Sequence, residues 1–461
     1  MLAGLGGAVS AILWGLLLLS VLVFVHEGGH FLAARVLGIR VKEFFLGMPC
    51  RFRVAWESKR YGTTYGATPL LLGGYTMVCG MEGETSPHLA AALASVARHG
   101  RATVDEVAAD AGCTTEEAIG ALATLADWGS VAPYYDPELG ERPSDSSWPS
   151  SFETQERDCA LLTKYDRGHD FSLPGATAQG QPHSIGDGPE AFLAQERSHT
   201  YLARGFWGRT FVLVSGVAVN LLCGILLVVV VLTLAGVPVA SDAPVAGTVL
   251  EGSIAQQAGI QAGDEFVSVD GVSVSTWQET VSAVKNALAE GVDFTVCVQR
   301  DGKPVELGVA LDGPADSLGI QAQVTSLKMG LGEAVSYALS YVGATASYIF
   351  QLLQPAHIGE IVESSSSVVG ISVMASEAAS QGAASFALLA AAVSLSLAFM
   401  NLLPVPPLDG GKIVIEAVQA VTRRPVSMRV QQVLSMVGIA LFMLLFFVLL
   451  RQDIVRFILG G

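Results

Sequence analysis

The feature that most constrains this chain is a pair of histidines inside an apolar stretch long enough to cross a membrane. No charged side chain occurs in residues 1–25, and the stretch then meets His26, Glu27 and His30 in the order His-Glu-Gly-Gly-His. Ionisable groups are costly at membrane depth, so their presence there indicates function. On a helix, His26 and His30 share one face, where both imidazoles can bind one zinc ion. Glu27 lies beside them, where it could take a proton from a metal-bound water.

The composition is that of a membrane protein. The 461 residues are 51% hydrophobic and 15% charged, whereas a soluble globular chain carries about 25% charged residues. A helical span needs roughly 20 apolar residues, and four segments meet this need: residues 2–25, 210–237, 385–403 and 433–450. The first is not a cleaved signal peptide, because it lacks a basic start, is too long and carries the histidine motif. We therefore expect a polytopic α-helical membrane protein with about four transmembrane helices.

The distribution of Lys and Arg predicts the orientation of these spans. Seven such residues follow the first span between residues 35 and 60, two precede the second span, and four lie between the third and fourth. Loops that carry an excess of Lys and Arg face the cytoplasm. We therefore expect residues 37–209 to be cytoplasmic and residues 238–384 to lie outside.

An acidic insertion separates the first two spans. Residues 82–200 hold 20 Asp and Glu against 7 Lys and Arg, a net charge of −13 in a chain whose total is −16. Residues 137–200 are rich in Pro, Gly, Ser and Asp without apolar periodicity, which predicts a flexible linker. The pattern of residues 82–136 resembles a helix-turn-helix with a wing, with helices at 88–98, 103–110 and 115–128 and a strand at 131–135.

This module has two interpretations. Its second helix could bind DNA, but that helix carries Glu116, Glu117 and Asp127 and no Lys or Arg. Binding to phosphates requires a basic surface. The charge therefore favours a helical interaction module, and nucleic acid is not expected as a partner.

Residues 37–81, between the first span and the insertion, have the composition of β-strands. Strand-like stretches at 51–56 and 63–68 precede an apolar stretch that contains Gly73 and Gly74. We expect a membrane-associated β-hairpin or sheet here, whose exposed edge could pair with an extended substrate. An ordinary amphipathic hairpin on the cytoplasmic face is an equally good interpretation.

The segment between the second and third spans has a more specific pattern. Residues 241–325 alternate strands and turns, and Ala-Gly-Ile-x-x-Gly-Asp at 258–264 is followed by Asp270-Gly271. This pattern looks like a PDZ domain, which binds extended peptides and peptide ends at a sheet edge. The alternative is an inert spacer. Residues 330–383 are expected to be an amphipathic, peripheral segment.

Two histidines leave a catalytic zinc site one protein ligand short. The best candidate is Asp409, in the run from Asn401 to Gly411 at the end of the third span. Pro404 and Pro406 break the helix there, and Asp409 lies where the chain restarts. Glu363 and Glu377 are weaker candidates, because they lie outside the apolar spans.

Together these motifs resemble the site-2 protease family of intramembrane zinc metalloproteases, in its RseP-like group with an extracytoplasmic PDZ domain. The resemblance covers residues 1–81 and 201–461. It rests on the His-Glu-x-x-His motif, the Gly-Gly-Tyr run, the PDZ-like pattern and the Asn-x-x-Pro-x-Pro-x-Leu-Asp-Gly run. The acidic insertion is not a usual feature of the family, so the resemblance implies nothing about its role.

The resemblance implies a role for each motif residue. His26, His30 and Asp409 match the zinc ligands, and Glu27 matches the catalytic base. Asn401 matches a residue that holds the substrate backbone, while Pro404 and Pro406 match the prolines that shape this loop. We expect pairing with the hairpin at Gly73 and Gly74, together with contact to Asn401, to hold the substrate in an extended form. Gly216 and Asn220 fit the family's Gly-x-x-x-Asn pattern, and as chemistry alone they could equally be a close helix contact and a buried polar bond.

The resemblance also implies the activity and the location. We expect a zinc endopeptidase in the inner membrane of a bacterium that cleaves single-span membrane proteins, such as anti-sigma factors. The alternative is a catalytically inactive scaffold that binds partners through its PDZ and cytoplasmic modules. The expected parts are transmembrane helices at 1–36, 201–238 and 384–410, the β region at 37–81, the insertion modules at 82–136 and 137–200, the PDZ domain at 241–325, the peripheral segment at 330–383, and a cytoplasmic turn with the fourth transmembrane helix at 411–461.

Overall fold

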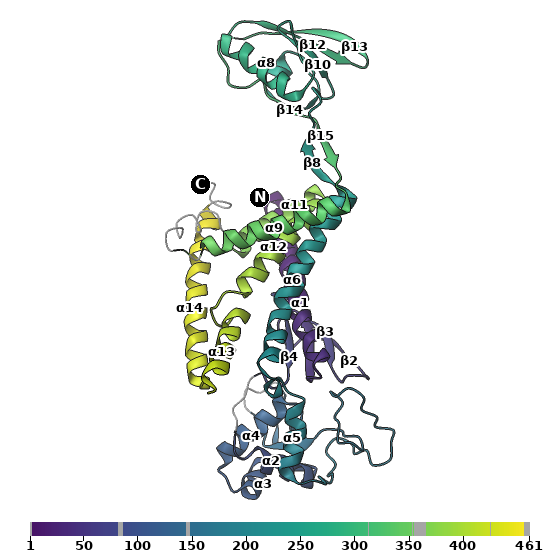
Figure 1. Ribbon diagram of the computed structural model, residues 1–461, viewed down its shortest axis with the longest axis vertical. Coiled ribbons are helices and arrows are strands. Elements are labelled where there is room, and N and C mark those ends of the chain that lie inside the picture. The colour runs from purple at the N-terminus through teal and green to yellow at the C-terminus, as the bar shows by residue number, and fades with distance from the viewer. Residues whose placement is uncertain are drawn as a thin grey trace. The chain divides into compact units, whose positions relative to one another are not determined.

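The computed structural model describes residues 2–81, 86–143, 148–311, 313–352, 354, 366–424 and 426–455. The chain divides into two compact units, one of Met1–Leu227 with Ala338–Gly461 and one of Val228–Tyr337. Four helices in the described part are long and apolar enough to cross a membrane, which confirms the number and approximate positions of the expected spans (Figure 1). They are α1 (Leu2–Val36), α6 (Phe206–Val230, continued to Ala235), α12 (Ala383–Asn401) and α14 (Met428–Asp453).

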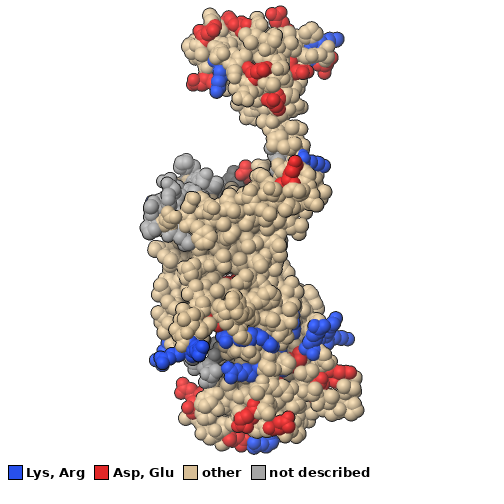
Figure 2. Space-filling model, in the orientation of Figure 1, with Lys and Arg blue, Asp and Glu red and all other residues tan. Residues whose placement is uncertain are grey.

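The surface of these helices fits a lipid environment. Leu13, Leu226 and Leu444 are each more than 60% exposed, at 62%, 62% and 64%. Extended apolar surface of this kind is avoided in soluble proteins but is expected where lipid replaces water. Figure 2 shows a helical body almost free of charged side chains, with Lys and Arg gathered in a band where it meets the insertion. This pattern supports a membrane-embedded body that ends at the band.

The β region before the insertion is a four-stranded mixed sheet rather than a hairpin around Gly73 and Gly74. Its strand order is β2-β3-β1-β4, and β1 runs parallel to β3 and antiparallel to β4. Gly73 has a φ of +136°, and its N–H donates to the Ser20 hydroxyl of α1 at 3.1 Å. The glycines therefore set β4 against α1 instead of turning a hairpin. The strands are β1 (Val41–Leu46), β2 (Val54–Glu57), β3 (Thr64–Ala67) and β4 (Gly74–Val78).

The first half of the insertion contains helices and a strand near the positions that the sequence predicted, with a three-stranded sheet. Thr103 and Thr114 begin α3 and α4 with capping boxes, in which each threonine pairs with the glutamate three residues later. These pairs explain part of the acidity, because a carboxylate in the first turn stabilises a helix. The elements are α2 (Leu89–His99), β5 (Arg101–Thr103), α3 (Val104–Ala111), α4 (Thr115–Asp127), β6 (Val131–Tyr134) and β7 (Ser151–Thr154), with sheet order β5-β7-β6.

The expectation of a flexible linker over residues 137–200 is corrected by the structure. This segment contains β7, which completes the wing, a short 3-10 turn (Pro137–Leu139) and the helix α5 (Pro189–Ser198). It is held by buried ion pairs, in which Arg40 contacts Asp166 at 2.6 Å and Glu196 at 2.7 Å, and Arg157 contacts Glu196 at 2.8 Å. Apolar periodicity does not report this kind of stabilisation, so the sequence pattern missed it.

The same ion pairs join the insertion to the end of α1. Arg40 follows α1 by four residues, and its side chain is 1% exposed among the insertion's carboxylates. Arg35, in the last turn of α1, donates to the carbonyl of Tyr165 at 2.8 Å. The insertion is therefore fixed to the helix that carries the histidine motif.

The second unit contains the strands and helices expected between residues 245 and 311. Its core includes Phe266, Val296, Val298 and Leu288. The sheet orders are β11-β10-β12-β13, β14-β9 and β15-β8. The elements are β8 (Val237–Ala240), β9 (Ala246–Val249), α7 (Ile254–Gln257), β10 (Glu265–Val269), β11 (Val272–Ser273), α8 (Trp277–Glu290), β12 (Phe294–Arg300), β13 (Lys303–Val309), β14 (Ile320–Ala322) and β15 (Val324–Leu327).

The described residues contain three further helices: α9 (Leu331–Leu352), α11 (Val368–Gln381) and α13 (Asp409–Thr422). The expected peripheral segment contains α9 and α11, while Glu363 lies outside the described residues. α11 packs against α1, where the hydroxyls of Ser10 and Ser376 are 3.1 Å apart.

We expect Arg40→Met to loosen the insertion. The substitution leaves Asp166 and Glu196 buried without one of their cations, and breaking a buried ion pair in this way costs about 3–5 kcal/mol. Amide hydrogen exchange of residues 86–200 in the full-length protein should become faster. Arg98→Met is the matched control, because Arg98 is 65% exposed and lies 3.5 Å from Asp110. Equal protection in the two variants would contradict the role of the buried cluster.

The insertion should also lose stability in mild acid. Burial, followed by the charge of Arg157, lowers the pKa of His183 from 6.5 to about 4. Below about pH 6.5 the His183 side chain binds a proton in the unfolded chain but stays neutral in the folded insertion. Stability that is present at neutral pH is therefore lost as the pH falls toward 4. His183→Leu should flatten this dependence in hydrogen-exchange measurements between pH 7 and 5, whereas substitution of the more exposed His99 by Gln should not.

Candidate metal centre

The candidate site begins with a close contact between α1 and α6. Gly29 of α1 faces Gly216 of α6, and a Cβ atom added to Gly29 would lie 2.8 Å from the Cα of Gly216. A Cβ added to Gly216 would lie 2.6 Å from Nε2 of His30 and 2.8 Å from Cε1 of His26. Small residues let membrane helices approach closely. Here they bring the backbone of α6 next to both imidazoles.

Three side chains converge beside this contact. Nε2 of His26 lies 3.2 Å from Nε2 of His30. Oδ2 of Asp409, the first residue of α13, lies 3.0 Å from the former nitrogen and 3.2 Å from the latter. All three residues are at most 9% exposed. The structure therefore brings together residues separated by almost 400 positions in the sequence.

The hydrogen bonding of His30 orients its lone pair toward this cluster. Nδ1 of His30 donates to the carbonyl of Val212 on α6 at 2.8 Å. In a neutral imidazole the other nitrogen then carries a lone pair, so Nε2 of His30 and Oδ2 of Asp409 are both electron donors at 3.2 Å. A cation between them relieves this repulsion, and an anchored second nitrogen is typical of metal-binding histidines.

The dimensions of the cluster fit zinc. Tetrahedral zinc with ligands at about 2.0–2.1 Å separates neighbouring ligand atoms by about 3.3 Å. The three observed separations are 3.0, 3.2 and 3.2 Å. A carboxylate oxygen of Glu27 lies within 4.8 Å of one ring nitrogen of each histidine, so Glu27 is close to the histidine pair. Three protein donors plus an open position are typical of catalytic zinc sites.

The sheet edge approaches this cluster from the side of Glu27. The Thr76 hydroxyl of β4 donates to the backbone carbonyl of Glu27 at 3.0 Å. A Cβ added to Gly74 would lie 3.2 Å from the Cα of Phe24, and one added to Gly73 would lie 3.3 Å from Val23. Gly73 and Gly74 thus allow β4 to run along α1 beside the catalytic motif.

The proline loop supports the position of Asp409. Cβ atoms added to Gly410 and Gly411 would collide with the backbone of Leu402 and Pro406, respectively, so the loop folds tightly over the start of α13. Asn401 ends α12 and is partly exposed, and Pro404 is exposed. In the described residues no side-chain hydrogen bond joins Asn401 to the three converging donors.

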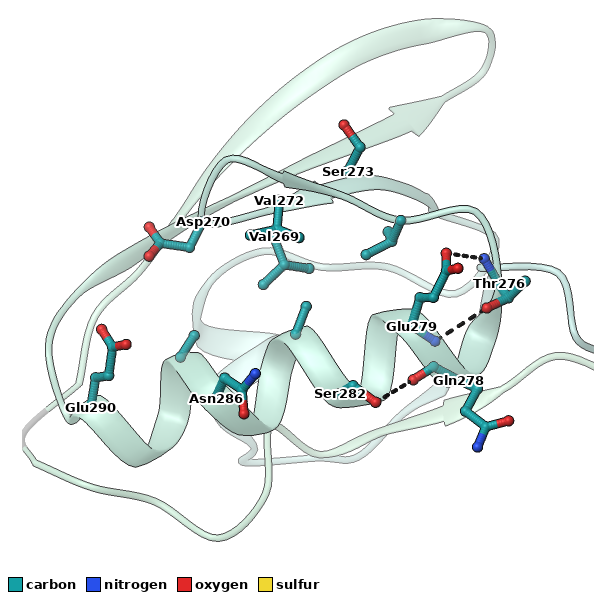
Figure 3. A pocket seen from close by; sticks show the side chains of 13 residues that line it. Val269, Asp270, Val272, Ser273, Thr276, Gln278, Glu279, Ser282, Asn286 and Glu290 are labelled. Atoms are coloured by element: carbon teal, nitrogen blue, oxygen red, sulfur yellow. Dashed lines mark hydrogen bonds between the residues drawn. The ribbon is translucent and has the colours of Figure 1, made fainter.

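A pocket of about 670 Å³ in the second unit is a weaker candidate site. It lies between β10–β11 and α8 (Figure 3). Glu279 accepts from the N–H and the hydroxyl of Ser275 at 2.8 Å, and Ser282 donates to the Gln278 carbonyl. Its central polar groups therefore serve α8 itself, and the described lining holds no His or Cys.

The comparisons with known proteins identify the family of the chain. The family model "Peptidase family M50" matches residues 14–445. The chain belongs to this family, the site-2 protease family. It is 25% identical over 456 residues to the Regulator of sigma-W protease RasP of Bacillus subtilis. The alignment covers 98% of this chain and 100% of that protein.

Two other relatives have similar names. The Zinc metalloprotease RasP of Bacillus licheniformis is 24% identical, covering 96% of this chain and 98% of its own length. The Zinc metalloprotease RasP of Geobacillus kaustophilus is 25% identical, and the alignment covers 95% of this chain and 96% of that protein. The chain is thus a membrane-bound zinc metalloprotease, and zinc is its metal.

Sequence reasoning missed the supporting contacts of the site. The Val212 carbonyl carries no signal in the sequence, because every residue has one. Thr76 is an ordinary strand residue until its contact with Glu27 is known. Gly216 did have a signal, since its spacing to Asn220 predicted a close helix contact, and the structure shows that contact at the histidines.

Gly216→Ala should remove zinc. The added Cβ would lie 2.6 Å from Nε2 of His30, so either the imidazole or α6 must move. The matched control is Gly28→Ala, next to Glu27, where the added Cβ meets nothing closer than Phe44 at 3.7 Å. Zinc content of the purified proteins should fall in the first variant and remain in the second. Full zinc occupancy in Gly216→Ala would contradict the described geometry.

Proposed function

We propose that this protein hydrolyses a peptide bond of single-span membrane proteins within or close to the bilayer. The observation that carries the proposal is the convergence of His26, His30 and Asp409 inside a body of membrane-length apolar helices. An ordinary surface protease needs no ligands on such helices. A metal centre among such helices is accessible to a substrate that itself lies in the membrane.

The side chains divide the reaction between them. The zinc would be held by His26, His30 and Asp409. When bound there, it would lower the pKa of a water molecule and polarise the scissile carbonyl. Glu27 takes the proton of the attacking water and delivers it to the leaving nitrogen, which is the usual duty of a carboxylate base. Val212 keeps His30 in the tautomer that this arrangement requires.

The substrate must be extended, because a helix hides its carbonyls in hydrogen bonds. β4 pairs with β1 on one side only, so its other edge can accept a strand. Its contact with Glu27 through Thr76 supports a substrate at this edge, beginning at Gly73 and Gly74. We further assign Asn401 to the substrate backbone, with Pro404 and Pro406 shaping its loop.

The second unit would select substrates as a PDZ domain. β14 pairs only with β9 among the described strands and leaves an edge for a peptide end. One relative is named Regulator of sigma-W protease, which favours anti-sigma factors as the substrate class. From the Lys and Arg distribution we expect this unit outside the bacterial inner membrane and residues 37–209 in the cytoplasm.

A catalytically inactive scaffold is the competing proposal. It explains the modules for binding partners, but it leaves the geometry of three converging donors and a neighbouring Glu27 without a purpose. Buried groups of this kind are costly in a membrane. We therefore favour the protease.

Glu27→Gln should abolish cleavage of a single-span substrate and leave the zinc content unchanged. The substitution removes the base but none of the three converging donors, so kcat should fall by at least about 100-fold. Cleavage is measured with purified protein in detergent or liposomes, and zinc by elemental analysis. Removing zinc with a chelator should also stop cleavage, and adding zinc back should restore it.

Glu377→Gln is the matched control, because Glu377 is an exposed carboxylate of α11. It should cleave at the wild-type rate. Undiminished turnover in Glu27→Gln would rule out the proposed mechanism, whereas the absence of cleavage by the wild type across candidate single-span substrates would favour the scaffold.

A further inference from the structure

The helix that supplies Asp409 is buried only at its first turn. Asp409, Gly410 and Gly411 are buried, and every later residue of α13 is partly or fully exposed. Val414 is 44% exposed and Val421 is 84% exposed. Apolar packing therefore does little to fix the body of this helix. Some other interaction must determine where α13 lies.

An ion pair supplies that interaction. Nη1 of Arg209, in the first turn of α6, lies 2.8 Å from Oε2 of Glu416 in the middle of α13. The two side chains are 22% and 12% exposed. Apart from the contacts of Asp409 with His26 and His30, this is the ion pair that joins α13 to another element among the described residues. Nε of Arg209 also donates to the carbonyl of Arg204 at 2.7 Å, which fixes the guanidinium.

A buried tyrosine completes the arrangement. The phenol of Tyr201 lies next to the Glu416 carboxylate. Tyr201 is 4% exposed, and its N–H donates to the carbonyl of Cys79, one residue after β4, at 2.9 Å. Glu416 is therefore held from two directions, by a cation on α6 and by a phenol anchored to the sheet.

The spacing of these residues links the ion pair to the metal centre. Asp409 and Glu416 are seven residues apart on α13, and Arg209 and Gly216 are seven apart on α6. Seven residues make about two helical turns, or about 10.5 Å, and bring both members of each pair to one helix face. Arg209 contacts Glu416, while Gly216 and Asp409 both contact the histidines. The two helices thus run antiparallel, with the metal centre at one end of their contact and the ion pair at the other.

We propose that Arg209, Glu416 and Tyr201 form a clamp that positions Asp409 for metal binding. They are positioning residues, since they touch neither the metal donors nor the substrate. This inference rests on the proposed role of Asp409 as the third zinc ligand. The clamp holds α13 at the distance from α6 at which the Asp409 carboxylate lies beside Nε2 of both His26 and His30. Without it, the exposed body of α13 can pivot about its first turn and withdraw the carboxylate.

The test measures zinc binding by the full-length protein in detergent. Glu416→Gln and Arg209→Gln each remove one charge of the clamp, and partners behind the ligands of a metal site are commonly worth 10–100-fold in affinity. We expect zinc, competed by a chromophoric chelator, to bind about 10–100-fold more weakly in each variant. Co²⁺ substituted for zinc should report the displaced carboxylate as an altered visible absorption spectrum.

Charge reversal and a matched control separate positioning from general damage. Arg209→Glu combined with Glu416→Arg rebuilds the pair with opposite polarity, and it should recover zinc affinity and the cobalt spectrum relative to either single reversal. Tyr201→Phe should weaken zinc binding less than Glu416→Gln. Lys412→Gln, an exposed charge on the same helix, should bind zinc as the wild type does.

Asp409→Asn distinguishes failure of the clamp from failure of the site. If Asp409→Asn loses zinc but Glu416→Gln and Arg209→Gln bind it with wild-type affinity and spectrum, the clamp is wrong and the zinc site stands. If Asp409→Asn binds zinc with wild-type affinity, both are wrong. Weak binding in the single variants without recovery in the double reversal would also overturn the clamp.

Discussion

The close contact of α1 with α6 is the constraint on which the rest of the site depends. It is made by backbone on both sides, because Gly29 and Gly216 leave no room for a Cβ. The same approach brings the Val212 carbonyl to His30 and so determines which nitrogen carries the lone pair. A larger residue at either glycine would push the helices apart. It would also break the hydrogen bond between His30 and Val212 that determines the tautomer of His30. One steric feature therefore sets the chemistry of the histidine pair.

Hydrolysis at this depth requires water in an apolar body, and the location of the cluster provides for it. His26 and His30 lie in the last third of α1, near the end of the helix that carries Arg35 and is followed by Arg40 and Lys42. Glu27 is only partly buried, whereas both histidines are buried. The proposed base is thus more accessible than the proposed metal donors, and β4 lies beside it.

Much of the site could be predicted from sequence, because its donors stand in short patterns with a direct chemical meaning. His26, Glu27 and His30 share a helix, and Asp409 follows a proline break, so residue type and position sufficed. The clamp could not be predicted, since Arg209 and Glu416 are ordinary charges until α6 and α13 are known to be neighbours. The error over residues 137–200 has the same origin. Buried ion pairs join distant residues and leave no periodicity in the sequence.

The buried ion pairs also limit what the insertion can do. A module on a flexible tether could bind partners independently of the protease, but Arg40 ties this one to the end of α1 through two buried carboxylates. Removing Arg40 alone would leave those carboxylates buried without one of their cations, which costs about 3–5 kcal/mol. The insertion and the histidine helix therefore move as one body. Its net charge of −13 disfavours nucleic acid, so any partner that binds it acts on a module rigidly joined to the catalytic helix.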